Sequence, residues 1–393
     1  MSLLLMANAD NNTALLQALK DYTASVDWAA EEDHFGTCEY IGDAFQALAA
    51  GASKDEERKL LGELLSRTYH QGDVLPVMVK LIYPLLVLCK TGKLYDRAAV
   101  MAFMTDIAEK HLYLRYRLLG LKPMRLAFTG DVYTTTVAAD AGINKRKAYY
   151  DETRRHTSLI QEVIADEDPV VSTLAVKLYL LTLYVESPGT AVEKMTAIRE
   201  LIAARNEAAQ ENLLIGAAIV LQQRVEQLPE SLIASVTPGP YLSVARLFNT
   251  PTTEDVAEGH ILLQSHEWKY DMHPWADGYI AAIACAGILS HTKGGKEEID
   301  AVLQAVRFQR NHSKKHPAEG AQWLPHEIMA EYLMVRFFAE HWASPVKVPW
   351  ASLNDTQQYI FRELSCETGI FTYLHSYMGL PAAKEALKEW LPQ

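Results

Sequence analysis

The chain has 393 residues, of which 49% are hydrophobic and 22% are charged. This composition is typical of a folded protein and excludes the disordered class, in which low hydrophobicity is combined with high charge. The 49 acidic residues outnumber the 37 basic ones and give a net charge of −12. Such a surface repels nucleic-acid phosphates, so nucleic-acid binding is disfavoured and a basic protein is the expected partner.

The cysteines and the apolar runs indicate in which cellular compartment the protein is expected. Cys38, Cys89, Cys285 and Cys366 are widely spaced and form no CxxC motif, which predicts reduced thiols in a cytoplasmic protein. The apolar start of the chain is too short for the hydrophobic region of a signal peptide. No apolar run approaches the ~20 residues that a membrane-spanning helix needs, so no membrane association is expected.

Apolar residues recur at helical spacing along almost the whole chain, and no region shows the sustained alternation of a half-exposed strand. Ser53 and Glu56 form a capping box, and the helix that follows ends at a turn over residues 70–72. Further helices are predicted over residues 11–26, 38–50, 74–90, 97–110, 144–165, 169–185, 190–204, 207–226, 241–248, 254–265, 276–290, 296–310, 324–342, 355–366, 370–378 and 382–391.

Several boundaries have a local cause. Asp73 is a candidate N-cap, Pro84 is expected to kink or end its helix, and Gly92 to stop it. Asp168 is predicted to cap the helix over 169–185, with Pro169 at its first position. That helix is apolar nearly all round, so we expect it to be covered on several sides.

The helix starts recur at steps of roughly 40 residues, the length of a HEAT or armadillo unit. The predicted fold is therefore all-α, an α-α superhelix (solenoid) of paired antiparallel helices. The expected parts are N-terminal repeats over 1–120, an irregular insertion or linker over 121–143, central repeats over 144–310 and a C-terminal helical cap over 311–393.

Two segments also resemble a known family. The first has Leu61, Leu64 and Leu65 before the turn His70-Gln71-Gly72, then Met78, Leu81, Ile82, Pro84, Leu85 and Leu86. The second, residues 166–185, has an acidic turn, Asp-Pro and a helix rich in valine and alanine. Both resemble bacterial HEAT-repeat proteins. The resemblance implies an α-solenoid and, more loosely, an immunity protein that inhibits a toxin, because similar proteins occur beside polymorphic toxin systems.

Two kinds of residue are candidates for binding a partner. The first is acidic and comprises Glu31, Glu32, Asp33, Asp166 and Glu167, which otherwise serve as helix caps or solvated faces. The second is aromatic and comprises Trp268, Tyr270 and Trp275, because exposed aromatic side chains are common interface hot spots. The competing interpretation is that these rings pack beneath a long loop. For the turn over 70–72, a structural role at the helix end is favoured over a contact.

Catalytic and cofactor sites are not predicted. His266 and His273, and also His312 and His316, lie close in sequence, but a zinc site needs three or four ligands in a defined geometry. The chain has neither a GxSxG nucleophile motif nor the glycine-rich loops that hold phosphates. We therefore expect no metal, no cofactor and no enzyme activity.

The leading hypothesis is a protein-binding solenoid, in particular an immunity protein that occludes a basic toxin domain. A general scaffold or adaptor is the alternative. An enzyme on a helical scaffold, either an α/α-toroid hydrolase or a HEAT-type DNA glycosylase, is less favoured because it needs a deep pocket or a basic groove.

Overall fold

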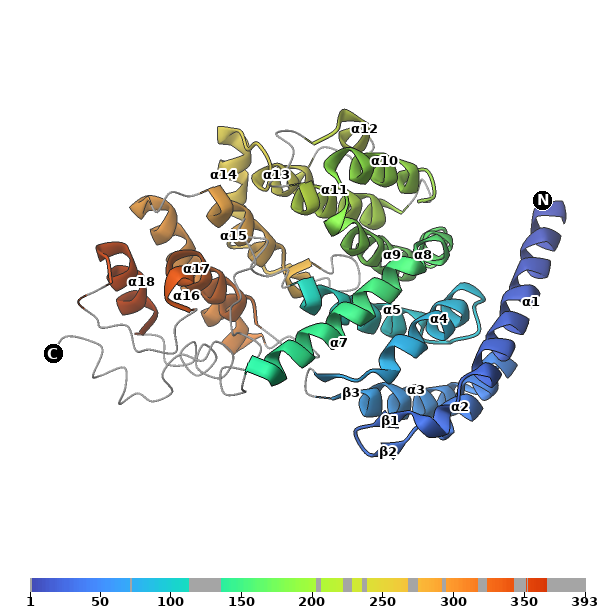
Figure 1. Cartoon of the computed structure of the whole chain (residues 1–393). Helices are drawn as coiled ribbons and strands as arrows, with labels where there is room; N and C mark the ends of the chain where they lie inside the picture. Colours follow the sequence, from blue (N-terminus) through green and yellow to red (C-terminus); the bar gives the residue numbers. More distant parts are fainter. Residues whose placement is uncertain are drawn as a thin grey trace. The chain divides into compact units, whose positions relative to one another are not determined.

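The computed structural model is built mainly of helices (Figure 1). This agrees with the all-α class predicted from the sequence. The structure describes residues 2–70, 73–112, 136–202, 206–221, 228–234, 239–267, 275–291, 295–316, 324–342, 351 and 353–365. In these ranges, no helix combines the length and the hydropathy needed to cross a membrane.

The contacts between residues that lie close in space divide the chain into two compact units. Unit 1 comprises residues 1–112, 140–186 and 197–209, and unit 2 comprises residues 113–139, 187–196 and 210–393. Most of the insertion predicted over 121–143 lies outside the described residues, although helix α7 begins inside it at Thr136. The helices predicted over 370–378 and 382–391 also lie outside the described residues.

Unit 1 is formed by the first half of the helices. They are α1 (Ser2–Ser25), η1 (Trp28–Ala30), α2 (Tyr40–Ala50), α3 (Lys54–Thr68), α4 (Val77–Lys90), α5 (Arg97–Leu112), most of α7 (Thr136–Arg155), α8 (Thr157–Ile164), α9 (Pro169–Thr182) and η3 (Leu183–Val185). Ser53 caps α3 as predicted, because its side chain accepts a hydrogen bond from the amide of Glu56. Gly92, at a φ of 66°, ends the turn that follows α4.

Unit 1 also contains two short antiparallel ladders that the helical periodicity did not predict. Strand β1 (Glu32–Asp33) pairs with β2 (Gly36–Thr37), and β3 (Tyr69–His70) pairs with β4 (Asp73–Val74). Asp73 thus lies in a strand and does not cap α4, which starts four residues later. The proposed left-handed Gly72 lies outside the described residues. Two-residue strands are too short to produce an alternating pattern, so only the tertiary structure reveals them.

Helix α4 continues through Pro84, where a kink or an end was predicted. A proline has no amide hydrogen, so the carbonyl oxygen of Lys80, four residues earlier, loses its helical donor. The hydroxyl group of Tyr22, on α1, donates to that oxygen at 3.0 Å. A side chain from a neighbouring helix therefore replaces the missing backbone bond and allows α4 to continue.

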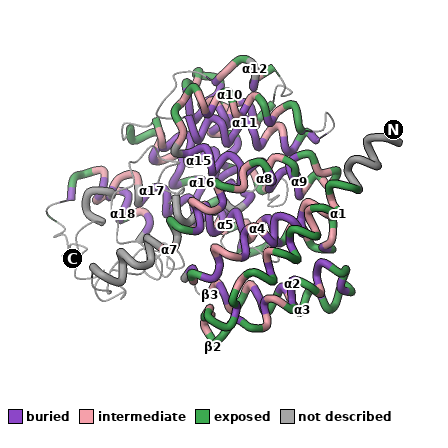
Figure 2. The backbone as a smooth tube through the Cα atoms, turned by 45° about the vertical axis from the view of Figure 1, so that its right-hand side comes forward, coloured by how far each residue is buried: buried purple, intermediate pink, exposed green. Residues whose placement is uncertain are grey.

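Helix α9 forms the centre of unit 1. Every residue from Val171 to Thr182 is buried, between α5 on one side and α8 on another (Figures 1 and 2). Asp168 caps its first turn by accepting from the amides of Val170 and Val171, and Pro169 follows it, as predicted. The ammonium group of Lys177, inside this buried helix, lies 2.5 Å from the carboxylate of Glu109 on α5. A charge buried at this depth requires such a partner.

Unit 2 contains most of the remaining helices. They are α12 (Glu230–Ile233), α13 (Pro240–Leu247), α14 (Thr253–Leu262), η4 (Trp275–Gly278), α15 (Ile280–His291), α16 (Lys296–Lys315), α17 (Pro325–Trp342) and α18 (Asp355–Ser365). Helices α10 (Pro188–Arg199) and α11 (Glu207–Leu221) each cross the boundary between the units.

Helix α15 is the core of unit 2, and its residues 280–289 are all buried. It packs against α13, α14 and α17. A Cβ atom on Gly287 would lie 2.6 Å from Cβ of Leu247, so α13 can approach this closely only because residue 287 has no side chain. The small side chains of α15, among them Ala281, Ala282, Ala284 and Ala286, are buried in this packing.

The bond from Tyr22 to Lys80 can be tested with a double-mutant cycle. In the wild-type background, we expect Tyr22→Phe to lower the free energy of unfolding by about 1–2 kcal/mol, because the carbonyl oxygen of Lys80 loses its donor. In the Pro84→Ala background, the new amide hydrogen supplies that donor, and we expect Tyr22→Phe to cost less than about 0.5 kcal/mol. Urea unfolding of the four proteins measures both values. Equal costs in the two backgrounds would contradict this explanation.

Candidate functional site

The most unusual charge distribution of the chain lies between Lys20 and Lys54. Residues 21–53, called here the acidic segment, contain no lysine or arginine and seven carboxylates: Asp21, Asp27, Glu31, Glu32, Asp33, Glu39 and Asp43. The segment therefore accounts for more than half of the net charge of −12. In the structure it forms the end of α1, η1, the β1–β2 hairpin and α2.

The β1–β2 hairpin is held by Arg67 of α3. Its Nε atom donates to Oδ2 of Asp33 at 2.7 Å and its Nη2 atom donates to Oδ1 at 3.3 Å. The guanidinium group also lies 4.4 Å from the centre of the Tyr40 ring, which is a cation–π distance. The side chain of Asp33 is fully buried, so this carboxylate holds the hairpin in place and is not available to a partner.

One further contact attaches the acidic segment to α4, and another holds the segment together internally. The carboxylate of Glu31 lies 2.5 Å from the ammonium group of Lys80 on α4. The indole of the buried Trp28 donates to the carbonyl oxygen of Thr23 at 2.8 Å. Gly36, at a φ of 140°, occupies a backbone conformation that side chains disfavour and so permits the tight hairpin turn.

The acidic segment exposes carboxylate side chains and one aromatic ring to solvent. The side chains of Asp21, Asp27, Glu32, Glu39 and Asp43 are exposed. The structure gives none of these five carboxylates an ion pair with any described residue. The tip of the hairpin carries Phe35, which is 67% exposed. Its amide donates to Oδ1 of Asp33 at 2.7 Å, so the tip is ordered by the same buried carboxylate.

The titration properties of the hairpin indicate a structural role rather than a catalytic one. Burial by itself would raise the pKa of Asp33, but hydrogen bonds from Arg67, from the Phe35 amide and from Tyr40 lower it overall. Burial and then the Asp33 charge raise the pKa of Tyr40 above its ordinary value. Burial, followed by the charges of Asp33 and Glu31, raises the pKa of the Cys38 thiol to about 11. At neutral pH this thiol is protonated and is a poor nucleophile.

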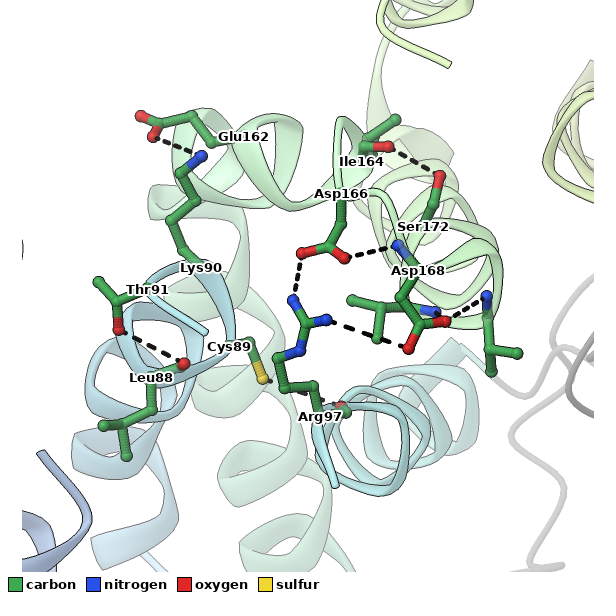
Figure 3. Close-up of polar contacts among 12 residues, drawn as sticks. Leu88, Cys89, Lys90, Thr91, Arg97, Glu162, Ile164, Asp166, Asp168 and Ser172 are labelled. Carbon is green, nitrogen blue, oxygen red and sulfur yellow. Dashed lines mark hydrogen bonds and ion pairs between the residues drawn. The ribbon is translucent and has the colours of Figure 1, made fainter. Parts of the chain in front are cut away.

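The second acidic candidate, Asp166 and Glu167, lies in the turn between α8 and α9, which contacts α5 (Figure 3). Asp166 makes an ion pair with Arg97, at the start of α5, and Asp168 lies 4.0 Å from the same guanidinium group. Asp166 also accepts from the amide of Asp168 at 2.9 Å. Asp166 and Asp168 therefore connect the turn between α8 and α9 to α5, whereas Glu167 is exposed.

The aromatic candidates do not form the surface expected from the sequence. Trp275 is buried with 0% exposure, so it belongs to the core of unit 2 and cannot contact a partner. This corrects the prediction that Trp275 is an exposed contact residue; most of the loop beneath which the competing interpretation placed the ring lies outside the described residues. The other two, Trp268 and Tyr270, lie outside the described residues.

Three of the four histidines considered as metal ligands do come together. The His266 and His312 rings are stacked with centroids 3.3 Å apart, and the His316 ring lies 4.7 Å from that of His312. Parallel rings direct their nitrogen atoms side by side and not toward a common point. In the described part of the chain, no group of three or more potential ligands is arranged to hold a metal ion. His273 lies outside it.

Comparison of the chain with protein-family models, with curated proteins and with solved structures finds no match. The function must therefore be inferred from the residues of the chain itself. Of the predicted site residues, the structure places Glu31, Glu32 and Asp33 together on the acidic segment. Phe35 and the carboxylates of Asp21, Asp27, Glu39 and Asp43 were not among the predicted site residues. The absence of lysine and arginine between residues 20 and 54 is the signal in the sequence that marks these carboxylates.

The hairpin makes a quantitative prediction. We expect Asp33→Asn to lower the free energy of unfolding at pH 7 by about 2 kcal/mol, because both charge-assisted bonds to Arg67 are weakened. Glu32→Gln, an equal charge change on an exposed neighbour, should alter it by less than about 0.5 kcal/mol.

The same residue gives a pH dependence with a defined sign. Because the pKa of Asp33 is lowered by folding, its contribution to stability is present above the unfolded-state pKa of about 3.9 and is lost as the pH falls through the lowered value. Asp33→Asn should therefore reduce the steepness of acid unfolding, measured by circular dichroism. An acid-unfolding curve that is unchanged in shape would refute this role.

Proposed function

We propose that this chain is a protein-binding helical scaffold that binds a basic partner through the acidic segment. The observation that carries the proposal is the set of five exposed carboxylates of the acidic segment, which form no ion pair with a described residue, together with the exposed Phe35 at the tip of the hairpin. Carboxylates without cationic partners create a negative potential that accelerates association with a basic surface. An exposed aromatic ring among them offers buried contact area once the partner is bound.

The rigidity of the acidic segment supports this proposal. A binding surface that is already ordered loses less conformational entropy on association than a flexible loop does. Within the acidic segment, Arg67 pairs with Asp33 and Lys80 pairs with Glu31, and Arg67 also reaches Glu63 of its own helix at 3.3 Å. The five exposed carboxylates form no ion pair with a described residue, and a surface that attracts cationic side chains requires such carboxylates.

Two narrower statements belong to the same proposal. Successive helices that pack against each other, α4 with α5, α8 with α9 and α13 with α14, support a stack of helix pairs of the solenoid type. The resemblance of residues 61–86 to bacterial HEAT-repeat proteins supports an immunity protein that occludes a basic toxin domain. The immunity role is tested by co-expressing this chain with a toxic basic domain encoded beside its gene. Toxicity that is not relieved would refute it, and the general scaffold would remain.

The proposed surface is tested by neutralising four of its carboxylates. The test variant carries Asp27→Asn, Glu32→Gln, Glu39→Gln and Asp43→Asn. The control variant has the same net charge and carries Glu193→Gln, Glu200→Gln, Glu254→Gln and Glu297→Gln, all at exposed positions outside the acidic segment. Proteins captured from the native host by each immobilised chain are identified, and the association rate of each purified partner is measured at low and high salt.

We expect the wild-type chain and the control variant to bind the same basic partner. We also expect the association rate of that partner to fall at least about tenfold between 50 mM and 500 mM salt. The test variant should associate more slowly and show little dependence on salt. A partner that binds the test variant as fast as the control variant does not use the acidic segment and would overturn the proposal.

Phe35 is expected to determine how long the complex lasts. Phe35→Ala should increase the dissociation rate by about 30-fold, equivalent to ~2 kcal/mol, because the buried contact area of the ring is lost. It should leave the free energy of unfolding within about 0.5 kcal/mol of wild type, because the ring is exposed in the free chain. Tyr95→Ala is a matched control, since Tyr95 is 66% exposed but lies outside the acidic segment. Equal effects of the two substitutions would exclude Phe35 from the interface.

A further inference from the structure

The turn that follows α14 in unit 2 is attached to α16 in two ways. The side-chain amide of the buried Gln309 donates to the carbonyl oxygens of Leu263 at 3.0 Å and of Ser265 at 2.6 Å. Beside these bonds, the ring of His266 is stacked on α16. It lies between Phe308, with centroids 4.8 Å apart, and His312, with centroids 3.3 Å apart. Residues 263–266 are thus held by one amide and one stack of rings.

The stack of rings depends on the protonation of its histidines. His266 and His312 are nearly parallel, with an angle of 10° between the ring planes, and His316 continues the stack at 4.7 Å from His312. Neutral imidazole rings can stack in this way. If two adjacent rings become imidazolium, like charges lie at van der Waals distance, and the Coulomb energy opposes the contact.

The described groups that act on His312 are positively charged or become so on protonation. Partial burial and then the positive charges of His266, His316 and Lys315 lower the pKa of His312. Glu267, next to His266 in sequence, accepts a hydrogen bond from the hydroxyl group of Tyr241 on α13. His260, on α14, makes no ring contact with any described residue.

Among the described residues, α17 and α18 also place charged groups against α16. On α17, the buried His326 faces Arg310 and Lys314 of α16. Glu363 of α18 pairs with Arg307, next to Phe308 in sequence, and Asp300 near the start of α16 accepts a hydrogen bond from the hydroxyl group of Tyr359.

We propose that His266, His312 and His316 form a pH-sensitive latch, which holds the 263–266 turn on α16 at neutral pH and releases it when the stacked rings become protonated. The release acts on the turn and leaves the α15 core in place, because residues 280–289 are buried and contain no titratable group other than Cys285.

The sign of the pH dependence follows from linkage. The folded-state pKa of His312 is lower than the ordinary histidine value of about 6.5, so the open turn binds protons more readily than the closed turn. The latch is therefore fully closed above about pH 6.5 and opens as the pH falls. Burial, and then Arg310 and Lys314, lower the pKa of His326 to about 4. Measurements at pH 5 and above thus separate the latch from the titration of His326.

Hydrogen exchange tests this latch directly in the full chain. Amide exchange of peptides covering residues 260–267 is measured at pH 7.5 and pH 5.0 and corrected for the intrinsic exchange rate, with residues 280–289 as the internal reference. In the wild type we expect exchange of the turn to become at least tenfold faster at pH 5.0, while the reference is unchanged. A turn that keeps its protection at pH 5.0 overturns the proposal.

Two substitutions identify the residues responsible. His312→Phe keeps a ring in the stack without a titratable nitrogen, and it should abolish the pH dependence while retaining protection at both pH values. His260→Gln removes a nearby histidine outside the stack, and it should leave the pH dependence as in the wild type. Opening at pH 5.0 that is as large in His312→Phe as in the wild type contradicts the latch.

A measurement without substitutions covers the case in which His312→Phe does not fold. NMR titration of the histidine ring carbons in the wild-type chain gives the protonation midpoint of His312, which should coincide with the pH midpoint of turn opening. Midpoints that differ by more than one pH unit would also overturn the proposal.

Discussion

The constraint on which unit 1 depends is the burial of α9 along nearly its entire length. A helix without a solvent-facing side must satisfy its terminal amides and its polar side chains from within the protein. Asp168 caps its first turn, Arg97 joins the preceding turn to α5, and Glu109 neutralises Lys177 in the middle. Removing one member of such a buried pair leaves an uncompensated charge, so these contacts also specify how α5, α8 and α9 must pack.

The pairing of charges also explains the surface proposed to bind a partner. Unit 1 uses Arg67 and Lys80 to hold the acidic segment, and each pairs with one of its carboxylates, Arg67 with Asp33 and Lys80 with Glu31. Residues 21–53 themselves contain no lysine or arginine that could neutralise the five exposed carboxylates. A rigid frame with unneutralised charge on its outer side is well suited to association, because the frame is already ordered and the charge acts over several ångströms.

In unit 1 the exposed carboxylates lack cationic partners, whereas in unit 2 two histidines lie beside groups that are cationic or can become so. His326 is buried against Arg310 and Lys314, and His312 lies beside His266, His316 and Lys315. In both places positive charge surrounds a histidine that is neutral at pH 7, so acidification works against the folded contacts. The acidic segment of unit 1 and the histidine stack of unit 2 therefore respond to different changes, the first to ionic strength and the second to pH.

The sequence by itself determined the features that depend on neighbouring residues. Periodicity predicted the helices, Ser53 and Asp168 predicted two of the caps, and the continuous apolar character of residues 169–185 predicted a buried helix. These predictions succeeded because capping and burial of a helix face are encoded within a few turns of the chain.

Only the tertiary structure decided the features that depend on distant residues. The donor that lets α4 pass through Pro84 comes from Tyr22, 58 positions away from Lys80. The partner of Asp33 comes from Arg67, the stacking partner of His266 comes from α16, and Trp275 is buried where an exposed ring was expected. Each of these results from packing between separate helices, and the spacing of residues along one helix carries no information about which distant side chain will complete a contact.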